Sequence, residues 1–278
     1  MQHFMYCIAM IAFALAQSIA YSQSGLDEEL LQQFDSAIVE LIADQAEVNQ
    51  SFSVLYLREH FSDSPKKLEP EIAGEWGQMA RKSHDKILRF DSRLWALKAI
   101  GRVDSLPEST LQINEKLFAN SPYFGEFKTE KYKRLRDHIS DPFGLCLAGS
   151  GEHHANKIGD AFITDFFKKG ELKSIKSVNG DLVALLQFTK NYCGVVRFGK
   201  AVDFRPVDVE GRRVPDGFGQ VGFENFQKLS FNYSTNTKWV KCKRFWVPLD
   251  IEVHNCMLPN NLEDVWTWRF REWKTGLT

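Results

Sequence analysis

The clearest pattern in the sequence is an alternation of apolar and polar residues near the C-terminus. From position 245 to position 253 every second residue is apolar, and residues 266 to 271 repeat the alternation with aromatic side chains. Because successive side chains of a β-strand point to opposite faces, both segments predict strands with one buried face. The residues predicted for the inner face are Phe245, Val247, Leu249, Ile251, Val253, Trp266, Trp268 and Phe270.

Two short signals define turns and irregularities in this C-terminal part. Asn179-Gly180 separates two apolar runs, at 173–178 and 181–189, and this dipeptide is typical of a two-residue β-hairpin turn. Pro248 lies inside the alternating segment, although proline has no N–H to donate to a neighbouring strand. We therefore expect its strand to lie at a sheet edge or to carry a bulge there. Further strands are expected at 194–198 and 220–233.

The N-terminal part of the chain begins with a helical pattern and then changes period. Apolar residues recur at spacings of three and four between Leu26 and Ile42, which predicts an amphipathic helix. Ser24 and Asp27 precede this pattern in a capping arrangement. From position 51 the period becomes two, and this alternation predicts the first strand, which begins near Phe52. These alternate residues are Phe52, Val54, Tyr56 and Arg58.

The middle of the chain carries weaker signals. We expect strands at 79–82 and 87–96, a loop at 62–70 and a short helix at 160–172. The segment 126–138 is dense in charge and has few apolar positions, which favours a solvated helix or loop.

The first residues have the profile of a signal peptide. An apolar run at 4–16 is followed by small residues, and the first acidic or basic side chain after it is Asp27. We expect residues 1–22 to be removed and residues 23–278 to form one exported domain, periplasmic or secreted. The n-region has no Lys or Arg, so an uncleaved membrane anchor stays open as an alternative.

Composition limits the chemistry of the mature chain. The net charge is −1, which gives no electrostatic basis for nucleic-acid binding. The even set of Cys146, Cys193, Cys242 and Cys256 permits disulfides or buried thiols, and we leave the two open. No cysteine or histidine spacing is typical of a metal site, and we expect no metal and no cofactor.

Several segments carry residue types that occur in catalytic sites. The glycines of 217–222 match a dinucleotide-binding spacing but lack its strand-before, helix-after context, so we expect a Gly-rich turn. His153 and His154 are adjacent in an extended loop, where side chains point apart. Asp250 and Glu252 share the wet face of one strand. We predict no catalytic residue from these. Basic and aromatic residues interleave at 238–246, which predicts an amphipathic strand with its basic residues outward, where they suit contact with a membrane surface.

The segment Phe245-Trp246-Val247-Pro248-Leu249-Asp250-Ile251-Glu252-Val253 resembles the end of proteins of the bacterial outer-membrane lipoprotein-sorting and carrier family. The resemblance is most specific over residues 173–205 and 238–253. It implies a half-open antiparallel β-barrel that is closed on one side by helices, with an apolar lumen for acyl chains.

We therefore predict an α+β fold in which a curved antiparallel sheet, a half-open β-barrel, wraps over one or two helices. The expected function is non-enzymatic binding of a lipid or acyl-chain ligand on the inner face. Two alternatives stay open: a scaffold whose inner face is filled by the helix, and an exported hydrolase acting on envelope polymers. The hydrolase would use Asp250, Glu252, His153 or His154.

Overall fold

The computed structural model describes residues 27–48, 50–62, 71–82, 87–98, 101–113, 116–121, 125–129, 142–147, 162–257 and 262–276. The predicted signal peptide at 1–22, with the alternative anchor, lies outside the described residues, and so does the predicted loop from residue 63 to 70. Within the described ranges, no helix has both the length and the apolar character needed to cross a bilayer.

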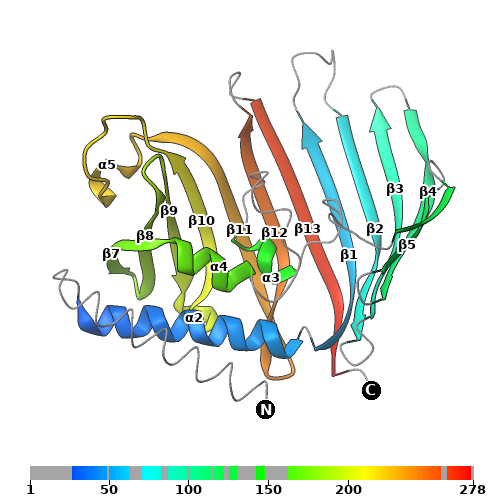
Figure 1. Cartoon of the computed structure of the whole chain (residues 1–278), viewed down its shortest axis with the longest axis horizontal. Helices are drawn as coiled ribbons and strands as arrows, with labels where there is room; N and C mark the ends of the chain where they lie inside the picture. Colours follow the sequence, from blue (N-terminus) through cyan, green and yellow to red (C-terminus); the bar gives the residue numbers. More distant parts are fainter. Residues whose placement is uncertain are drawn as a thin grey trace.

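A single antiparallel sheet dominates the structure (Figure 1). Its thirteen strands follow the order β6-β5-β4-β3-β2-β1-β13-β12-β11-β10-β9-β8-β7, and the end strands β6 and β7 do not pair with each other. The strands are β1 (Ser51–Ser62), β2 (Glu71–Lys82), β3 (Ile87–Lys98), β4 (Gly101–Ile113), β5 (Lys116–Ser121), β6 (Gly125–Thr129), β7 (Glu171–Val178), β8 (Asp181–Thr189), β9 (Tyr192–Gly199), β10 (Arg205–Arg213), β11 (Ser230–Cys242), β12 (Phe245–Met257) and β13 (Leu262–Thr275).

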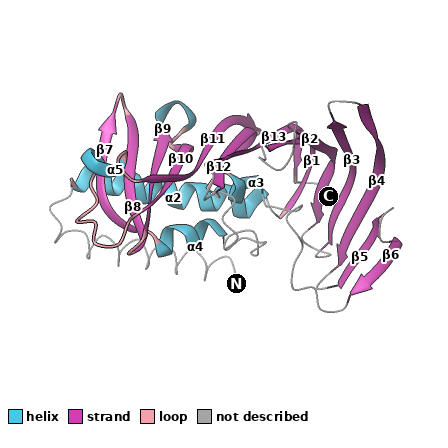
Figure 2. Ribbon diagram, turned by 90° about the horizontal axis from the view of Figure 1, so that it is seen from above, coloured by secondary structure: helices cyan, strands magenta, loops and turns pink. Residues whose placement is uncertain are grey.

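The chain enters this sheet at β1, in the middle of the strand order, and fills one half of the sheet before the other. It runs from β1 to the edge strand β6, passes through two helices to the opposite edge strand β7, and returns strand by strand until β13 pairs with β1. The sheet is strongly curved, and we call its concave side the inner face (Figure 2). A curved, unclosed antiparallel sheet with a few helices confirms the predicted fold class.

Three described helices lie on the inner face, against the strands from β7 to β12: α2 (Glu28–Val48), α3 (Pro142–Leu145) and α4 (Phe162–Lys169) (Figure 2). The side chain of Asp27 caps α2 by accepting hydrogen bonds from the N–H groups of Glu29 and Leu30 at 3.0 and 3.3 Å. Ser24, the other predicted capping residue, lies outside the described residues. One stripe of α2 is buried, as its periodicity predicts, and includes Leu31, Phe34, Ala37, Ile38, Leu41, Gln45 and Val48.

The main core lies between these helices and the sheet. The ring of Phe34 on α2 meets Phe167 on α4 at 6.1 Å and Phe198 on β9 at 5.7 Å, both edge to face, an arrangement that aromatic pairs favour. A second, smaller core lies on the other side of the sheet, since Leu185 alternates with the inner residues Ala184 and Leu186. There the short helix α5 (Phe223–Phe226) covers β8 and β9 with Phe226.

Two predictions on turns and bulges are confirmed. Asn179 and Gly180 have φ of 54° and 87°, as a primed hairpin turn requires, and they join β7 to β8. On β12, Lys238 of β11 faces Asp250 while the next residue, Trp239, faces Pro248. Leu249 is therefore the extra residue of a bulge beside Pro248, and β12 lies inside the sheet rather than at its edge.

Other expectations were wrong or incomplete. No strand was expected at 101–121, where β4 and β5 lie, and residues 126–129 belong to strand β6 instead of a solvated helix or loop. The segment after the glycines of 217–222 begins with α5, so that β11 starts only at Ser230. Among the described residues, Cys146, Cys193, Cys242 and Cys256 are thiols rather than disulfides, and burial raises the pKa of the Cys193 thiol to about 11.

Candidate functional site

The residues predicted for the inner face are mostly part of the main core. Five of them are at most 4% exposed: Val247, Ile251, Val253, Trp268 and Phe270. Phe245 and Trp266 are partly buried against the same core. Leu249 is half-buried and belongs to neither core cluster, because it is the extra residue of the β12 bulge.

The bulge also corrects the predicted alternation along β12. Pro248, expected on the wet face, is buried. Trp246, expected to face water, is half-buried against the main core: its backbone N–H donates to Asp44 of α2 at 3.4 Å, and its indole N–H donates to Asp203 at 2.7 Å. A bulge adds one residue to a strand and so changes which side chains share a face.

An aromatic cluster joins β1 to β13 on the inner face. Trp268 stands opposite Arg58, and Phe270 stands opposite Tyr56. The rings of Trp268 and Phe270 stack at 6.0 Å, and the ring of Tyr56 lies 6.0 Å from that of Trp268. In register on the other side of β13, Ile251 and Val253 of β12 face Trp268 and Trp266. The sheet thus places a continuous apolar surface across three strands.

Arg58 brings a positive charge into this aromatic cluster. It is only 6% exposed, and the carbon of its guanidinium lies 5.1 Å from the ring centroids of both Trp266 and Trp268. A guanidinium over an aromatic face is attracted by the ring quadrupole, more strongly where water is excluded. The inner face at β1 and β13 is therefore both aromatic and cationic. In the sequence, Arg58 follows Phe52, Val54 and Tyr56 at the same period of two, which places it on the same face of the strand.

A row of polar contacts holds the C-terminal half of α2 on the sheet. Arg205 of β10, 4% exposed, bonds Asp44 at 2.7 Å and Glu40 at 3.2 Å. Arg244, in the β11–β12 turn, pairs with Glu47 at 3.1 Å. Acidic residues at spacings of three and four lie on one side of a helix, so this row is parallel to the apolar stripe.

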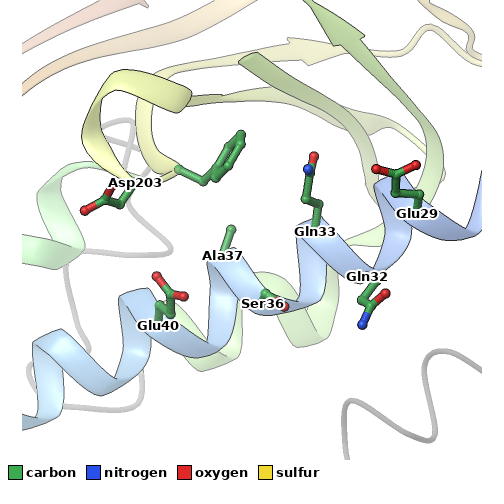
Figure 3. A pocket seen from close by; sticks show the side chains of 8 residues that line it. Glu29, Gln32, Gln33, Ser36, Ala37, Glu40 and Asp203 are labelled. Atoms are coloured by element: carbon green, nitrogen blue, oxygen red, sulfur yellow. The ribbon is translucent and has the colours of Figure 1, made fainter. Parts of the chain in front are cut away.

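A pocket of about 410 Å³ lies along the N-terminal half of α2 (Figure 3). Its walls are polar and acidic apart from Ala37 and Phe204, and none of the eight predicted inner-face residues lines it. A hydrogen bond from the Trp246 indole lowers the pKa of Asp203 at the rim. The lining residues are Glu29, Gln32, Gln33, Ser36, Ala37, Glu40, Asp203 and Phe204.

The residues considered for a hydrolase are not gathered in the described part of the structure. Asp250 pairs with Arg271 at 2.9 Å, and Glu252 lies 2.6 Å from the ring of His254, both pairs being exposed to water. His153 and His154 lie outside the described residues. Among the residues that the structure describes, no group of three or more His, Cys, Asp and Glu could hold a metal ion.

Sequence reasoning missed the contribution of β11 to the inner face. Tyr233, Thr235, Thr237 and Trp239 are all buried, and the residues between them are exposed or half-buried. The signal was present, because these four residues alternate with Ser234, Asn236 and Lys238. Two threonines in the series reduce its hydrophobicity and obscure the period of two.

Comparisons with known proteins return only distant structural similarities. No protein-family model and no curated protein matches the sequence. Among solved structures, the chain is similar to a LolA superfamily protein from Nitrosomonas europaea, with 10% identity, a TM-score of 0.41 and coverage of 87% of this chain and 94% of the other. A DUF1329 family protein from Desulfovibrio piger matches with 9% identity, a TM-score of 0.40 and coverage of 87% and 94%.

A domain named as an outer membrane lipoprotein-sorting protein, from Vibrio parahaemolyticus, matches with 12% identity, a TM-score of 0.40 and coverage of 87% and 95%. These names include the family that the sequence resembles. At such low identities and TM-scores these similarities carry no argument about function. The function proposed below is argued from the residues of this chain.

Proposed function

We propose that the protein is an exported, non-enzymatic envelope protein that binds a lipid or another apolar ligand on the inner face of its sheet. The predicted signal peptide supports export. The ligand would lie against β12 and β13, which hold the eight predicted residues, and against β1, which pairs with β13. The sequence resemblance to lipoprotein carriers agrees with this proposal.

The observation that carries the proposal is the position of the aromatic cluster relative to the helices. The described helices lie against β7 to β12, and α2 also contacts β1, whereas no described helix lies against the inner face of β2 to β6 (Figure 2). Tyr56, Trp268 and Phe270 lie on the strands at this border. These three rings are buried, and Trp266 beside them on β13 is half-buried. A partly exposed aromatic side chain at the edge of a buried apolar cluster offers an apolar ligand a point of contact.

Burial favours Trp266 over Trp268 as the first contact of a ligand. Trp268 is 4% exposed and fills the main core, whereas Trp266 is half-buried. The charge of Arg58 beside both rings would suit an apolar ligand that also carries a polar or anionic group. The scaffold alternative shares the buried core but predicts no binding at Trp266.

The test begins with native mass spectrometry of the purified mature protein, in which we expect a co-purified lipid. Titration with a fluorescent fatty acid should then saturate. Trp266→Ala should weaken binding about tenfold, the change that corresponds to about 1.4 kcal/mol, with a small loss of stability. Trp246→Ala, at the start of β12 and away from the β13–β1 border, serves as the control and should bind as wild type does.

Two outcomes would count against the proposal. If no lipid co-purifies and the fluorescent fatty acid does not bind, the inner face is a filled core and the protein is a scaffold. If N-terminal sequencing of the protein from cells finds the chain still beginning at Met1, the export part of the proposal gives way to the membrane-anchor alternative.

A further inference from the structure

Two threonine hydroxyls on the inner face have no hydrogen-bond partner. Thr235 and Thr237 of β11 are 1% and 3% exposed, and neither side-chain oxygen is hydrogen-bonded by the residues that the structure describes. Their neighbours on the same face differ. The hydroxyl of Tyr233 donates to the carbonyl of Leu147 at 3.3 Å, and the indole N–H of Trp239 donates to that of Pro206 at 2.8 Å.

The pair lies beside the proposed ligand surface. Thr235 faces Val253 and Thr237 faces Ile251 across β11 and β12. These two residues face Trp266 and Trp268 in turn across β13. Neighbouring strands are about 4.8 Å apart, so each hydroxyl lies about 10 Å along the face from a tryptophan of the border. The surroundings are apolar, with Val209 opposite Thr235 on β10.

A buried hydroxyl without a partner lowers the stability of the folded state. Valine has the same shape and the same preference for strands, and it would fill these positions without that cost. One such hydroxyl is within the ordinary range for a protein of this size. Two of them at alternate positions of one strand, facing the same apolar surface, form a local array of unused donors.

We infer that Thr235 and Thr237 form a polar subsite that donates hydrogen bonds to the ester carbonyl of an acyl-ester ligand on the inner face. The inference rests on the function proposed above and specifies its ligand class. An ester carbonyl accepts hydrogen bonds and donates none, which suits a hydroxyl donor. The acyl chain would extend from there along Ile251 and Val253 toward the tryptophans.

The experiment compares two probes of equal size, methyl palmitate and nonadecane, by displacement of a bound fluorescent fatty acid. We expect the wild-type protein to bind methyl palmitate about tenfold more tightly, a typical effect of a desolvated hydrogen bond. In the double variant Thr235→Val, Thr237→Val this preference should fall to near one. The urea midpoint of the double variant should equal or exceed that of wild type, because the unpartnered hydroxyls are gone.

Two further variants make the readout specific. Thr237→Ser keeps the hydroxyl and should retain a preference for the ester. Thr267→Val, on β13 between the two tryptophans and on the opposite face, replaces a threonine outside the subsite and should leave the preference unchanged.

The outcomes separate the inference from the proposed function. If wild type binds both probes equally, or if the double variant keeps the preference, the inner face still binds apolar ligands but the threonines are not its polar subsite. If wild type binds neither probe and no fatty acid, the proposed function and the inference fail together.

Discussion

Arg205 and Asp44 are 161 residues apart in the chain and form an ion pair at 2.7 Å between strand β10 and helix α2. The arginine side chain is 5% exposed and that of Asp44 is 15% exposed. Arg205 also donates to the carbonyl oxygen of Asp203 at 2.7 Å. This pair ties the C-terminal half of α2 to β10 on the inner face, because the buried guanidinium has its shortest anionic contact with Asp44.

We predict that Asp44→Ala lowers the free energy of unfolding by about 3 kcal/mol, because it leaves the buried guanidinium of Arg205 with only the exposed carboxylate of Glu40 as an anionic partner. Glu40→Ala is the matched control. Glu40 contacts the same arginine at 3.2 Å, but its side chain is 59% exposed, so its loss should cost less than about 1 kcal/mol. Urea titrations of the three proteins measure both values. Equal losses for the two variants would contradict a dominant role of Asp44.

Asp35 on α2 gives a second prediction, on pH dependence. Burial raises its pKa from 3.8 to about 6. A carboxyl whose pKa is raised in the folded state binds its proton more tightly there. Protonated Asp35 therefore contributes to the stability of the folded state below pH 4, and this contribution is lost as the pH rises through about 6 and the carboxyl ionises.

The variant Asp35→Asn should consequently be more stable than wild type at pH 8, by about 1 to 2 kcal/mol after allowance for partial exposure. At pH 3.5 the difference should vanish. Urea midpoints of both proteins at the two pH values provide the measurement, and the low-pH comparison is the internal control. A variant that is less stable at pH 8 would contradict the raised pKa.

The hairpin at Asn179-Gly180 provides a third prediction. Gly180 has φ of 87°, and a β-carbon there would also approach the side chain of Lys200 at 3.2 Å. Gly180→Val should destabilise the domain by more than about 1 kcal/mol, because a β-branched residue strongly disfavours positive φ. Gly219→Val is the control, since a β-carbon at Gly219 meets no atom within 4 Å. Denaturant midpoints should separate the two variants.

Trp268 allows a fourth prediction, on the filled part of the inner face. Its ring packs on Phe270, Tyr56 and Arg58. Trp268→Ala should cost about 3 to 5 kcal/mol, as large-to-small changes in a core do. Thr267→Ala, the preceding residue on the opposite face, should change stability by about 0.5 kcal/mol or less. A small loss for Trp268→Ala would indicate that the ring borders open space instead.

The elements predicted correctly from sequence are those whose pattern is set locally. The apolar spacing of α2, the Asn179-Gly180 turn and the effect of Pro248 each depend on residues a few positions apart. The alternation in β13 likewise placed Trp268 and Phe270 in the core. Such patterns are reliable because the direction of each side chain is set by the repeat of the helix or strand that carries it, whatever lies elsewhere in the chain.

The missed elements depend on neighbours distant in the chain. Strand β4 contains Pro107, which lies opposite Arg93 of β3. The register of the two strands shifts between Leu94 and Ala96 of β3. A proline and several polar residues indicate a loop when read alone, and only pairing with β3 makes the segment a strand. For the site, the pairing of Arg205 with Asp44 could not be predicted, because neither residue has a local motif.

The pairing of β1 with β13 has a consequence for how the molecule is made. Strand β13 is synthesised after the other described strands, yet in the order of the sheet it lies between β1 and β12. Until Leu262–Thr275 is present, both neighbours have an unpaired edge, and the two halves of the sheet have no hydrogen bonds between them. Joining strands so far apart in sequence makes folding slow. We therefore expect the sheet to stay incomplete until β13 has been synthesised, and to close in one step after that.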